Sequence, residues 1–564
     1  MSAARPRRGY SPASGELAAS VGAHTTNQPP PFEGRNIYLA DRLLQAAVQR
    51  EGAHWAHERL GAWGEALGRA DTLALAARAN RYVPELRTHD RFGERVDEVV
   101  FDPAWHELMR LAMLEGEHCA PWLEPRAGAQ VARAAAYLLH AEIENGTQCP
   151  LTMTYAAVPV LRRYAQGFAA LAESWLPRVL GREYDARSAP ITAKTSALIG
   201  MGMTERQGGS DVRANVTRAE RSSDGSYRLT GHKWFFSAPM SDAHLVLAQA
   251  SGGLSCFFLP RLLPDGTRNA VHIARLKDKL GNRSNASSEV EFENAAAWLL
   301  GEEGRGVPVI IEMVQHTRLD CAIGSAGLVR AAVAQAVHHA GHRRAFGKRL
   351  VEQPLMQNVL ADLIVEAEAS TALALRLARS FEAGANEDER ALARLATPAI
   401  KYWVCKRAPA VVADAMEVLG GNGYVEESIL PRLYREAPLN SIWEGSGNVI
   451  CLDVLRAARR ESAAVTQLIS ELELAHGADA RLDRYSAGLA ATLRAPEINE
   501  REARRIAGAI AVGLAAGILV RHAPAAIADA YCASRLGDGY GGTIGMLPAA
   551  IDLAKIIEAA IPRQ

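Results

Sequence analysis

The spacing of hydrophobic residues along the chain changes twice. From residue 36 to about 190, apolar residues recur every three or four positions, as in Leu44, Ala47 and Val48, which predicts helices. Asp41 lies just ahead of these three and is of a residue type that caps helix starts. Around residue 196 the interval shortens to two, which predicts strands up to about residue 306.

Several segments support these two changes. Asp224-Gly225 is a hairpin signal, and His244–Leu247 and Val290–Phe292 are typical of half-buried strands. After Gly306 the helical spacing returns, for example at Met356, Leu360, Leu363 and Ala367. Helices are expected to residue 460 and, after a break near Ala475–Gly477, through the last hundred or so residues.

The pattern therefore predicts an α+β fold that is mostly α. The predicted parts are a flexible tail (1–35), an N-terminal helical domain (36–195), a middle β domain (196–306), a helical bundle (307–460) and an extra helical domain (461–564).

Composition narrows the function classes. The 564 residues are 48% hydrophobic, and 63 basic and 63 acidic side chains cancel, so no global field attracts nucleic acid or an anionic membrane. Seven scattered cysteines without a CxxC pair favour a reducing cytoplasmic setting over a disulfide framework or a zinc site. The apolar run Ile506–Val520 falls short of the roughly 18 residues that cross a membrane, and we expect a buried helix there.

Histidine pairs suggest metal binding only weakly. His54 and His57 are three apart, and His338 and His342 are four apart, but neither pair has a third ligand nearby in sequence. We predict no metal site. There is also no GxSxG elbow and no P-loop in the sequence.

Three segments could carry chemistry. Met201–Val212 follows an apolar strand and combines hydroxyls with turn glycines that could bind a polar ring edge or a phosphate. Gly231–Ser237 places three consecutive aromatic residues on a strand, which suits a planar ligand or a core strand. Asn440–Ile450 holds Glu444 just ahead of a helix, where a carboxylate is either a helix cap or a base.

In this order these segments resemble the acyl-CoA dehydrogenase family. The matching stretches are Met203–Val212, Gly231–Ser237, Lys279–Ser284, Arg343–Lys348, Glu417–Gly423 and Ile442–Ser446. Their order and spacing resemble the family from roughly residue 140 to 460, and nearly the whole chain after residue 27 resembles the AidB-type, alkylation-response branch of that family. The resemblance implies FAD as cofactor and a homotetramer.

The resemblance also implies roles for individual residues. It places FAD against Met203, Thr204, Ser210, Phe235, Phe236 and Ser237 on one side and against Ile442, Trp443, Gly445, Ser446 and Asn448 on the other. It assigns Arg343, Phe346, Gly420 and Gly421 to the adenosine half of a neighbouring subunit's FAD. Glu417 departs from the family, because a carboxylate there would repel the cofactor phosphates.

Glu444 is the catalytic base that the resemblance implies. Burial beside Trp443 and a flavin would raise its pKa toward the operating pH. Some relatives carry the base at the position of Thr317, which cannot serve, and Asp320 is almost a full helical turn away. Arg318 either holds polar groups of an acyl-CoA substrate or forms a salt bridge, and Trp443 is bulky enough to shorten the acyl cavity.

The AidB-type resemblance implies a second role. Such proteins are associated with protection against DNA alkylation, with DNA contact through the C-terminal domain and weak dehydrogenase activity. Residues 461–564 hold ten basic and twelve acidic residues, a net charge of −2, which does not support strong DNA binding. Two helical arginine clusters are candidates: Arg456, Arg459 and Arg460, and Arg501, Arg504 and Arg505.

The sequence leaves three functions open. The protein is a DNA-associated flavoprotein that inactivates alkylating small molecules, or a dehydrogenase of short or branched acyl-CoA thioesters, or a scaffold in which FAD is structural. No membrane partner is expected.

Overall fold

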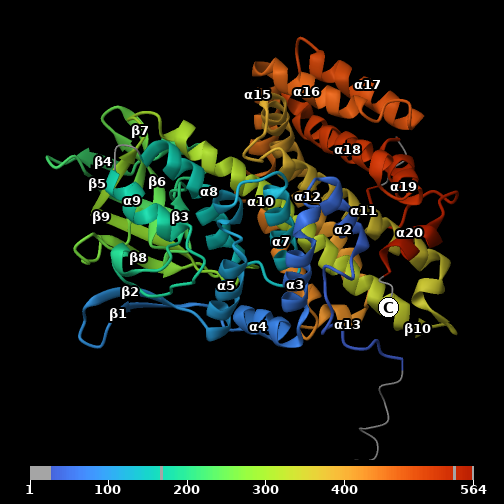
Figure 1. The fold of residues 1–564 in the computed structure, drawn as a ribbon, viewed down its shortest axis with the longest axis horizontal. Coiled ribbons are helices and arrows are strands. Elements are labelled where there is room, and N and C mark those ends of the chain that lie inside the picture. The colour runs from blue at the N-terminus through green and yellow to red at the C-terminus, as the bar shows by residue number, and fades with distance from the viewer. Residues whose placement is uncertain (1–26, 166–168, 538–541, 562–564) are drawn as a thin grey trace, which may run out of the picture.

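A computed structural model describes residues 27–165, 169–537 and 542–561. Figure 1 shows a β domain at one end, long helices in the middle and the C-terminal helices at the other end. Most of the predicted flexible tail, residues 1–26, lies outside the described residues.

The N-terminal part is mainly helical. Its helices are α2 (Arg42–Arg50), α3 (His57–Gly68), α4 (Ala70–Arg81), α5 (Pro103–Glu115), α6 (Ala120–Leu123), α7 (Ala129–Ala141), α8 (Gln148–Tyr164) and α9 (Ala169–Val179). Asp41 caps α2 as predicted, because its Oδ1 accepts the N–H of Leu44 at 2.9 Å.

An antiparallel hairpin interrupts these helices and was not predicted. It consists of β1 (Glu85–His89) and β2 (Arg95–Val100), which are mostly exposed or half-buried. The hydrophobic pattern is weak there because neither strand has a fully buried face. Gly93 adopts a φ of 86° in the turn that joins the strands.

The middle part is a closed β structure. Its strands are β3 (Ile199–Gly202), β4 (Arg218–Arg221), β5 (Tyr227–Ser237), β6 (Ala243–Ala250), β7 (Gly253–Pro260), β8 (Val271–Leu276) and β9 (Ser287–Leu300). The order β3-β6-β4-β5-β9-β7 closes on itself because β7 also pairs with β6. The hairpin predicted at Asp224-Gly225 joins β4 and β5, with Gly225 at a φ of 84°.

Strand β6 differs from the prediction of a half-buried strand. Its first six residues are all buried, since Leu245 and Leu247 face a helix-covered core while Val246 and Ala248 face the inside of the β domain. Both faces of β6 are covered, so the residues Leu245–Ala248 form an apolar run rather than an alternating pattern.

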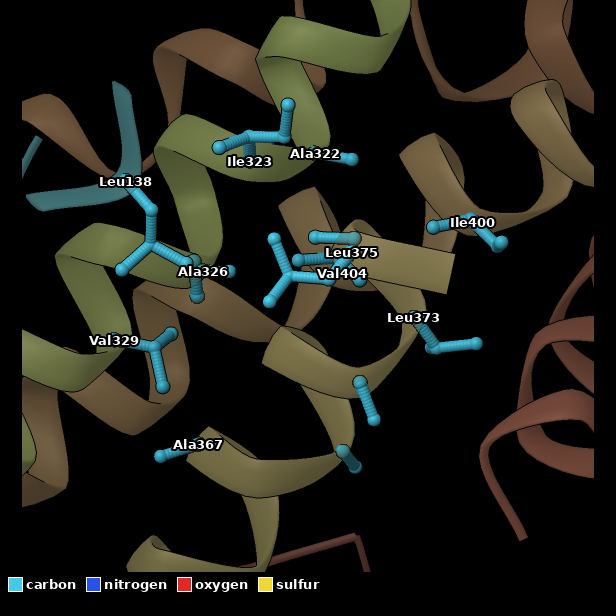
Figure 2. Packing of buried hydrophobic residues seen from close by; sticks show 14 of the residues in the cluster. Leu138, Ala322, Ile323, Ala326, Val329, Ala367, Leu373, Leu375, Ile400 and Val404 are labelled. Atoms are coloured by element: carbon cyan, nitrogen blue, oxygen red, sulfur yellow. The ribbon is translucent and has the colours of Figure 1, made fainter. Parts of the chain in front are cut away.

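The C-terminal bundle is built on three long helices. These are α10 (Gly306–His342), α11 (Pro354–Arg379) and α12 (Glu387–Val418), and they are accompanied by β10 (Arg344–Ala345), β11 (Lys348–Arg349), α13 (Gly421–Tyr424), α14 (Leu430–Glu436) and α15 (Gly447–Arg460). Figure 2 shows their core, where Ala326 and Val329 of α10 pack near Leu375 of α11 and Val404 of α12. Burial of Leu360, Leu363 and Ala367 confirms the helical spacing predicted for α11.

The extra helices complete the chain. They are α16 (Ser462–Glu473), α17 (Ala480–Arg494), α18 (Ala503–His522), α19 (Ala525–Arg535) and α20 (Leu553–Ala560). The segment Glu500–His522 is long and apolar enough to cross a membrane, but 78% of its most apolar window is buried inside the protein. The prediction of a buried helix there is confirmed.

The prediction of a free tail fails for residues 27–35. Asn27 donates from Nδ2 to the carbonyl of Arg344 at 2.9 Å, and Phe32 stacks on His338 with ring centroids 4.3 Å apart. These contacts hold the segment against the end of α10. A run of prolines lacks donors of its own, but the neighbouring Asn27 and Phe32 supply side-chain contacts.

Candidate functional site

The loop that carries Glu444 is held in an uncommon conformation. Glu444 has a φ of 58° and Gly445 a φ of 104°, so a non-glycine residue occupies the left-handed region. Two basic side chains donate hydrogen bonds to three successive carbonyls of this loop. Lys401 Nζ donates to the carbonyls of Trp443 at 2.8 Å and Gly445 at 2.7 Å. Arg318 Nε donates to the carbonyl of Glu444 at 3.0 Å. Such strain persists only where surrounding contacts fix the backbone, and these two cations do so.

The carboxyl group of Glu444 faces α10. Thr317 Oγ1 lies 2.7 Å from Glu444 Oε2, and the side chain is half-buried. Burial raises the pKa of Glu444, while the Thr317 hydrogen bond and then the charges of Lys401 and Arg318 oppose that rise. A raised carboxyl pKa is what a proton-abstracting base requires.

Thr317 can serve both protonation states of Glu444. Its hydroxyl also lies 3.1 Å from the carbonyl of Val314. The hydroxyl can therefore donate to ionised Glu444, or accept from protonated Glu444 while its own proton turns to Val314.

Of the two roles left open for Arg318, the structure favours the salt bridge over contact with a substrate. It is 5% exposed, and besides the Glu444 carbonyl its Nη1 contacts Asp453 Oδ2 at 2.7 Å. A buried guanidinium with these partners ties α10 to α15 and does not face a substrate. Asp320 points elsewhere, since it forms a buried ion pair with Arg133 of α7.

The aromatic strand β5 presents only one of its two phenylalanines. Phe235 is 53% exposed, and Lys277 Nζ lies 4.7 Å from its ring centroid. Phe236 is 1% exposed and stacks on His244 inside the β domain, with centroids 3.9 Å apart. The prediction that Phe236 borders the flavin is wrong, because successive side chains of a strand point to opposite faces.

The loop from Met203 to Ser210 borders the same region. Met203 and Trp443 pack against one shared apolar core cluster, so the structure brings the β domain and the Glu444 loop together. Glu205 is buried with Lys233 at 2.8 Å, which anchors the loop, and Thr204 is half-buried. Ser210 is exposed, and Ser237 Oγ lies 3.4 Å from Ser287 Oγ at the end of β5.

The residues assigned to adenosine form a separate group. Asn27 accepts the N–H of Arg344 at 2.7 Å, and Arg343 Nη1 donates to its carbonyl at 2.7 Å. The adjacent Gln28 Oε1 accepts from Asn422 at 3.3 Å, so the N-terminal segment connects the β10–β11 hairpin to the glycine loop. Phe346 is 97% exposed, and a Cβ added at Gly420 or Gly421 would meet nothing within 4 Å.

Glu417 does not clash with this group within one chain. It is exposed on the last turn of α12, and the pKa of Asp414 is raised first by burial and then by the Glu417 charge. The structure gives it no cationic partner among the described residues.

Sequence reasoning missed two polar groups on the segment that leads into β9. Asn285 is fully buried, yet neither its Nδ2 nor its Oδ1 has a hydrogen-bond partner in the described chain. Burial lowers the pKa of Lys279 to about 8, and its Nζ donates to the Asn285 carbonyl. The Lys279–Ser284 motif pointed to this place, but spacing alone could not reveal an unpaired amide.

The candidate DNA arginines are mostly engaged locally. Arg459 donates to the carbonyl of Ile498 at 2.6 Å, and Arg504 Nε donates to Asn448 Oδ1 at 2.8 Å. Arg456 lies 3.4 Å from Asp453, and Arg505 pairs with Glu502 at 2.9 Å. Arg460 and Arg501 are exposed without a side-chain partner in the described part of the chain.

No group of three or more His, Cys, Asp or Glu side chains in the described residues is arranged to hold a metal ion. All seven cysteines are buried and unpaired.

Comparison with known proteins resolves the family. Residues 27–186 match the model of the adaptive response protein AidB N-terminal domain, 200–295 the acyl-CoA dehydrogenase middle domain, and 304–458 the acyl-CoA dehydrogenase C-terminal domain. The chain is 51% identical to the putative acyl-CoA dehydrogenase AidB of Escherichia coli K12 over 522 residues, covering 92% of this chain and 95% of that one. The chain belongs to the AidB-type branch of the acyl-CoA dehydrogenase family. Members of this family are flavin-dependent oxidoreductases that act on CH–CH bonds and use FAD.

Two further similarities extend over most of this chain. It is 33% identical to acyl-CoA dehydrogenase family member 11 of Caenorhabditis elegans over 448 residues, covering 75% of this chain and 70% of the relative. Its fold is similar to the crystal structure of Caenorhabditis elegans ACDH-11 in complex with C11-CoA, with a TM-score of 0.82, 27% identity, and coverage of 92% and 95%. The prediction of the family and its fold is confirmed.

The site fits FAD. Phe235 and Ile442, 53% and 61% exposed, are apolar surfaces suited to a planar ring, and the buried Asn285 amide is a polar group that lacks a partner. Gly420 and Gly421 leave open space where a phosphate or ribose could approach the backbone.

Proposed function

We propose that this protein is a FAD-dependent acyl-CoA dehydrogenase in which Glu444 removes the α-proton of an acyl thioester. One observation carries the proposal: a half-buried carboxyl with a raised pKa is fixed on a left-handed residue and hydrogen bonded to Thr317. A helix cap would not need this arrangement. Glu444 makes no side-chain bond to the start of α15, whose N-cap is Ser446.

The residues that would hold FAD come from both domains. Two groups of residues would border it: Met203, Thr204, Ser210, Phe235 and Ser237 on one side, and Ile442, Trp443, Gly445, Ser446 and Asn448 on the other. When bound, FAD supplies the acceptor for the hydride that leaves the β-carbon of the substrate.

Residues of this chain would accept the α-proton and stabilise the negative charge that develops on the thioester oxygen. Glu444 Oε2 accepts the proton, and Thr317 then accepts a hydrogen bond from the new carboxylic acid. The backbone N–H of Glu444 has no acceptor among the described residues, so it is free to donate to the thioester oxygen as enolate charge develops.

We propose that the active unit contains at least two copies, in keeping with a homotetramer. Arg318 is on α10 and Arg343 directly follows that helix, 25 residues further on, which corresponds to roughly 38 Å along the helix axis at 1.5 Å per residue. That distance supports the view that Arg343, Phe346 and the Gly420–Gly421 turn contact a neighbouring subunit's FAD. The 97% exposure of Phe346 is consistent with a surface completed by another copy.

The substrate class follows from the chemistry and from one relative. A structure of ACDH-11 holds C11-CoA, so acyl-CoA thioesters of about that length are included with short and branched ones as candidates. Trp443 donates its indole N–H to Asn440 at 2.8 Å, which fixes the bulky ring beside the base. We propose that this fixed indole limits the acyl chains that fit.

The test is anaerobic flavin reduction by a panel of acyl-CoA thioesters. The unaltered protein should bleach with at least one thioester, and Glu444→Gln should slow that bleaching roughly a hundredfold or more, because general-base catalysis contributes about 10²–10⁴-fold. Glu473→Gln, which changes an exposed carboxylate on α16, is the matched control. Equal rates for Glu444→Gln and the unaltered protein would reject Glu444 as the base.

A second candidate function is the adaptive response to alkylation, with double-stranded DNA or an alkylating compound as partner. It is favoured by the match of residues 27–186 to the AidB N-terminal domain model. The local pairing of Arg459, Arg504 and Arg505 leaves Arg460 and Arg501 as the free cations of the two clusters. We propose that any DNA contact depends on these two.

Duplex binding measured across a salt series tests that candidate. Changing Arg460 and Arg501 to alanine should weaken binding and reduce the salt slope by roughly two. An unchanged slope would exclude these arginines, and no binding near physiological salt would exclude DNA as a direct partner.

A further inference from the structure

A cavity of about 990 Å³ lies outside the Glu444 site. It is bounded by one face of α10 near its C-terminal end, by α11, by α20 and by the N-terminal segment 31–43. Figure 1 shows α20 and β10 at the end of the molecule away from the β domain. Its apolar lining includes Val333, Val337, Ile364 and Ile557.

A buried carboxyl group opens into this cavity. Glu142, at the end of α7, is 6% exposed and lines the cavity wall. Its carboxyl oxygens have no hydrogen-bond or ion-pair partner among the described residues. An unpartnered carboxyl in such a place is costly unless something supplies a counter-charge or a proton.

The neighbouring arginines do not pair with Glu142, because each makes other contacts. Arg330 donates to Asp41 at 2.8 Å, to Glu368 at 2.7 Å and to Thr371 at 2.9 Å. Arg35 lies with its guanidinium carbon 3.6 Å from the ring centroid of Phe32.

Carboxylates outnumber guanidinium groups in the cavity lining. The lining holds six carboxylates and four guanidinium groups, so when fully ionised it carries a net charge of −2; they are Glu33, Asp41, Glu142, Glu352, Glu368 and Glu558 against Arg35, Arg42, Arg330 and Arg349. An anionic ligand would add to this excess, whereas a cation would reduce it.

We propose that this cavity binds a small organic cation with an apolar body, whose ammonium head pairs with Glu142 and whose hydrocarbon part lies against Val337, Ile364 and Ile557. The volume suits a small ligand, since such sites commonly measure about 300–1,000 Å³ and are mostly apolar with a few polar groups. The site is separate from the proposed dehydrogenase chemistry.

Binding is coupled to proton release. Burial, and then Asp41, raise the pKa of Glu142 to about 8, while Arg330 and Arg35 oppose the rise. Glu368 of α11 and Glu558 of α20 also face the cavity. Glu142 is therefore mostly protonated at pH 7 in the free protein, and an arriving cation displaces that proton.

Titration calorimetry of the full-length, FAD-loaded protein tests the proposal. Hexylammonium chloride is the probe. Hexanoate is the comparison of opposite charge and 1-hexanol the uncharged comparison, and all three are titrated at pH 7 in two buffers of different ionisation enthalpy. We expect hexylammonium to bind more tightly than either, to release close to one proton, and to bind at least tenfold more weakly to Glu142→Gln. Glu558→Gln, which removes an exposed carboxylate at the same cavity, should change affinity less than twofold.

A second variant tests the same cavity independently, in case Glu142→Gln does not fold. Val337→Trp fills the apolar part of the cavity while leaving Glu142 in place, and it should abolish binding. The proposal is overturned if hexylammonium fails to bind, if hexanoate binds more tightly, or if both variants bind hexylammonium as the unaltered protein does.

Discussion

Replacing Thr317 with valine removes the hydroxyl that contacts Glu444 while keeping the shape of the side chain. In the ionised state Glu444 loses a hydrogen bond to a charged group, worth about 1.5–3 kcal/mol, and in the protonated state it loses a neutral one, worth about 0.5–1.5 kcal/mol. The difference, about 1–1.5 kcal/mol, disfavours the ionised base. A free-energy change of 1.36 kcal/mol corresponds to a tenfold change in the ionisation constant. The ionised fraction of Glu444 should therefore fall roughly five- to tenfold at acidic pH.

The assay is the pH dependence of kcat/KM for anaerobic flavin reduction. Burial already raises the pKa of Glu444, so activity rises with pH as the carboxyl loses its proton, and Thr317→Val should move that rise to higher pH. On the alkaline plateau, where Glu444 is ionised in both proteins, the rates should agree within about twofold. Thr317→Ser restores a hydroxyl and should restore the original profile.

The reasoning is refuted if the acidic limb does not move. It is also refuted if the rate of Thr317→Val falls by the same factor at every pH, because that result would indicate displaced geometry rather than a changed proton affinity.

Further expectations concern FAD retention, the loop and stability. Phe235→Ala should lower the flavin content of the purified protein with little effect on urea unfolding, whereas Phe236→Ala should cost roughly 3–5 kcal/mol of unfolding free energy, because only Phe236 is in the core. Similar unfolding curves for the two variants would contradict this. Lys401→Met leaves the carbonyls of Trp443 and Gly445 without their donor. It should lower the free energy of unfolding in urea by at least about 2 kcal/mol and should also lower kcat. Unchanged stability would show that the loop keeps its conformation without Lys401. Because the pKa of Glu142 is raised in the folded state, the unaltered protein loses stability as pH rises from about 4.5 to about 8. The stability of Glu142→Gln relative to the unaltered protein should therefore increase over that window, and the difference should stay constant above it. Thermal unfolding midpoints across the pH range check this, and a constant difference between the two proteins would disprove it.

The order of the parts and the place of Glu444 could be predicted from the sequence. Both depend on local patterns: the change of period near residues 196 and 306, and a carboxylate between Trp443 and two glycines. The family match then gave these patterns a chemical meaning. The alternation along β5 could also have separated Phe235 from Phe236, since their side chains must point to opposite faces.

The contacts that fix the site could not be predicted. Lys401 and Arg318 hold the Glu444 loop from 43 and 126 residues away, and no spacing rule identifies such partners. Arg318 looked like a substrate residue because a lone arginine beside a candidate site gives no sign of its buried partner Asp453. Cytoplasmic localisation, predicted from unpaired cysteines, stays a prediction.

The length of α10 has a genetic consequence. One end of this helix supports the base of its own subunit, and the other end precedes the hairpin that we assign to a neighbour's cofactor. Two inactive alleles, one altered at Glu444 and the other at Arg343, would then damage different halves of each composite centre. When both variants are expressed in one cell, mixed assemblies should contain some intact centres and regain part of the lost activity. Neither variant expressed alone should regain it.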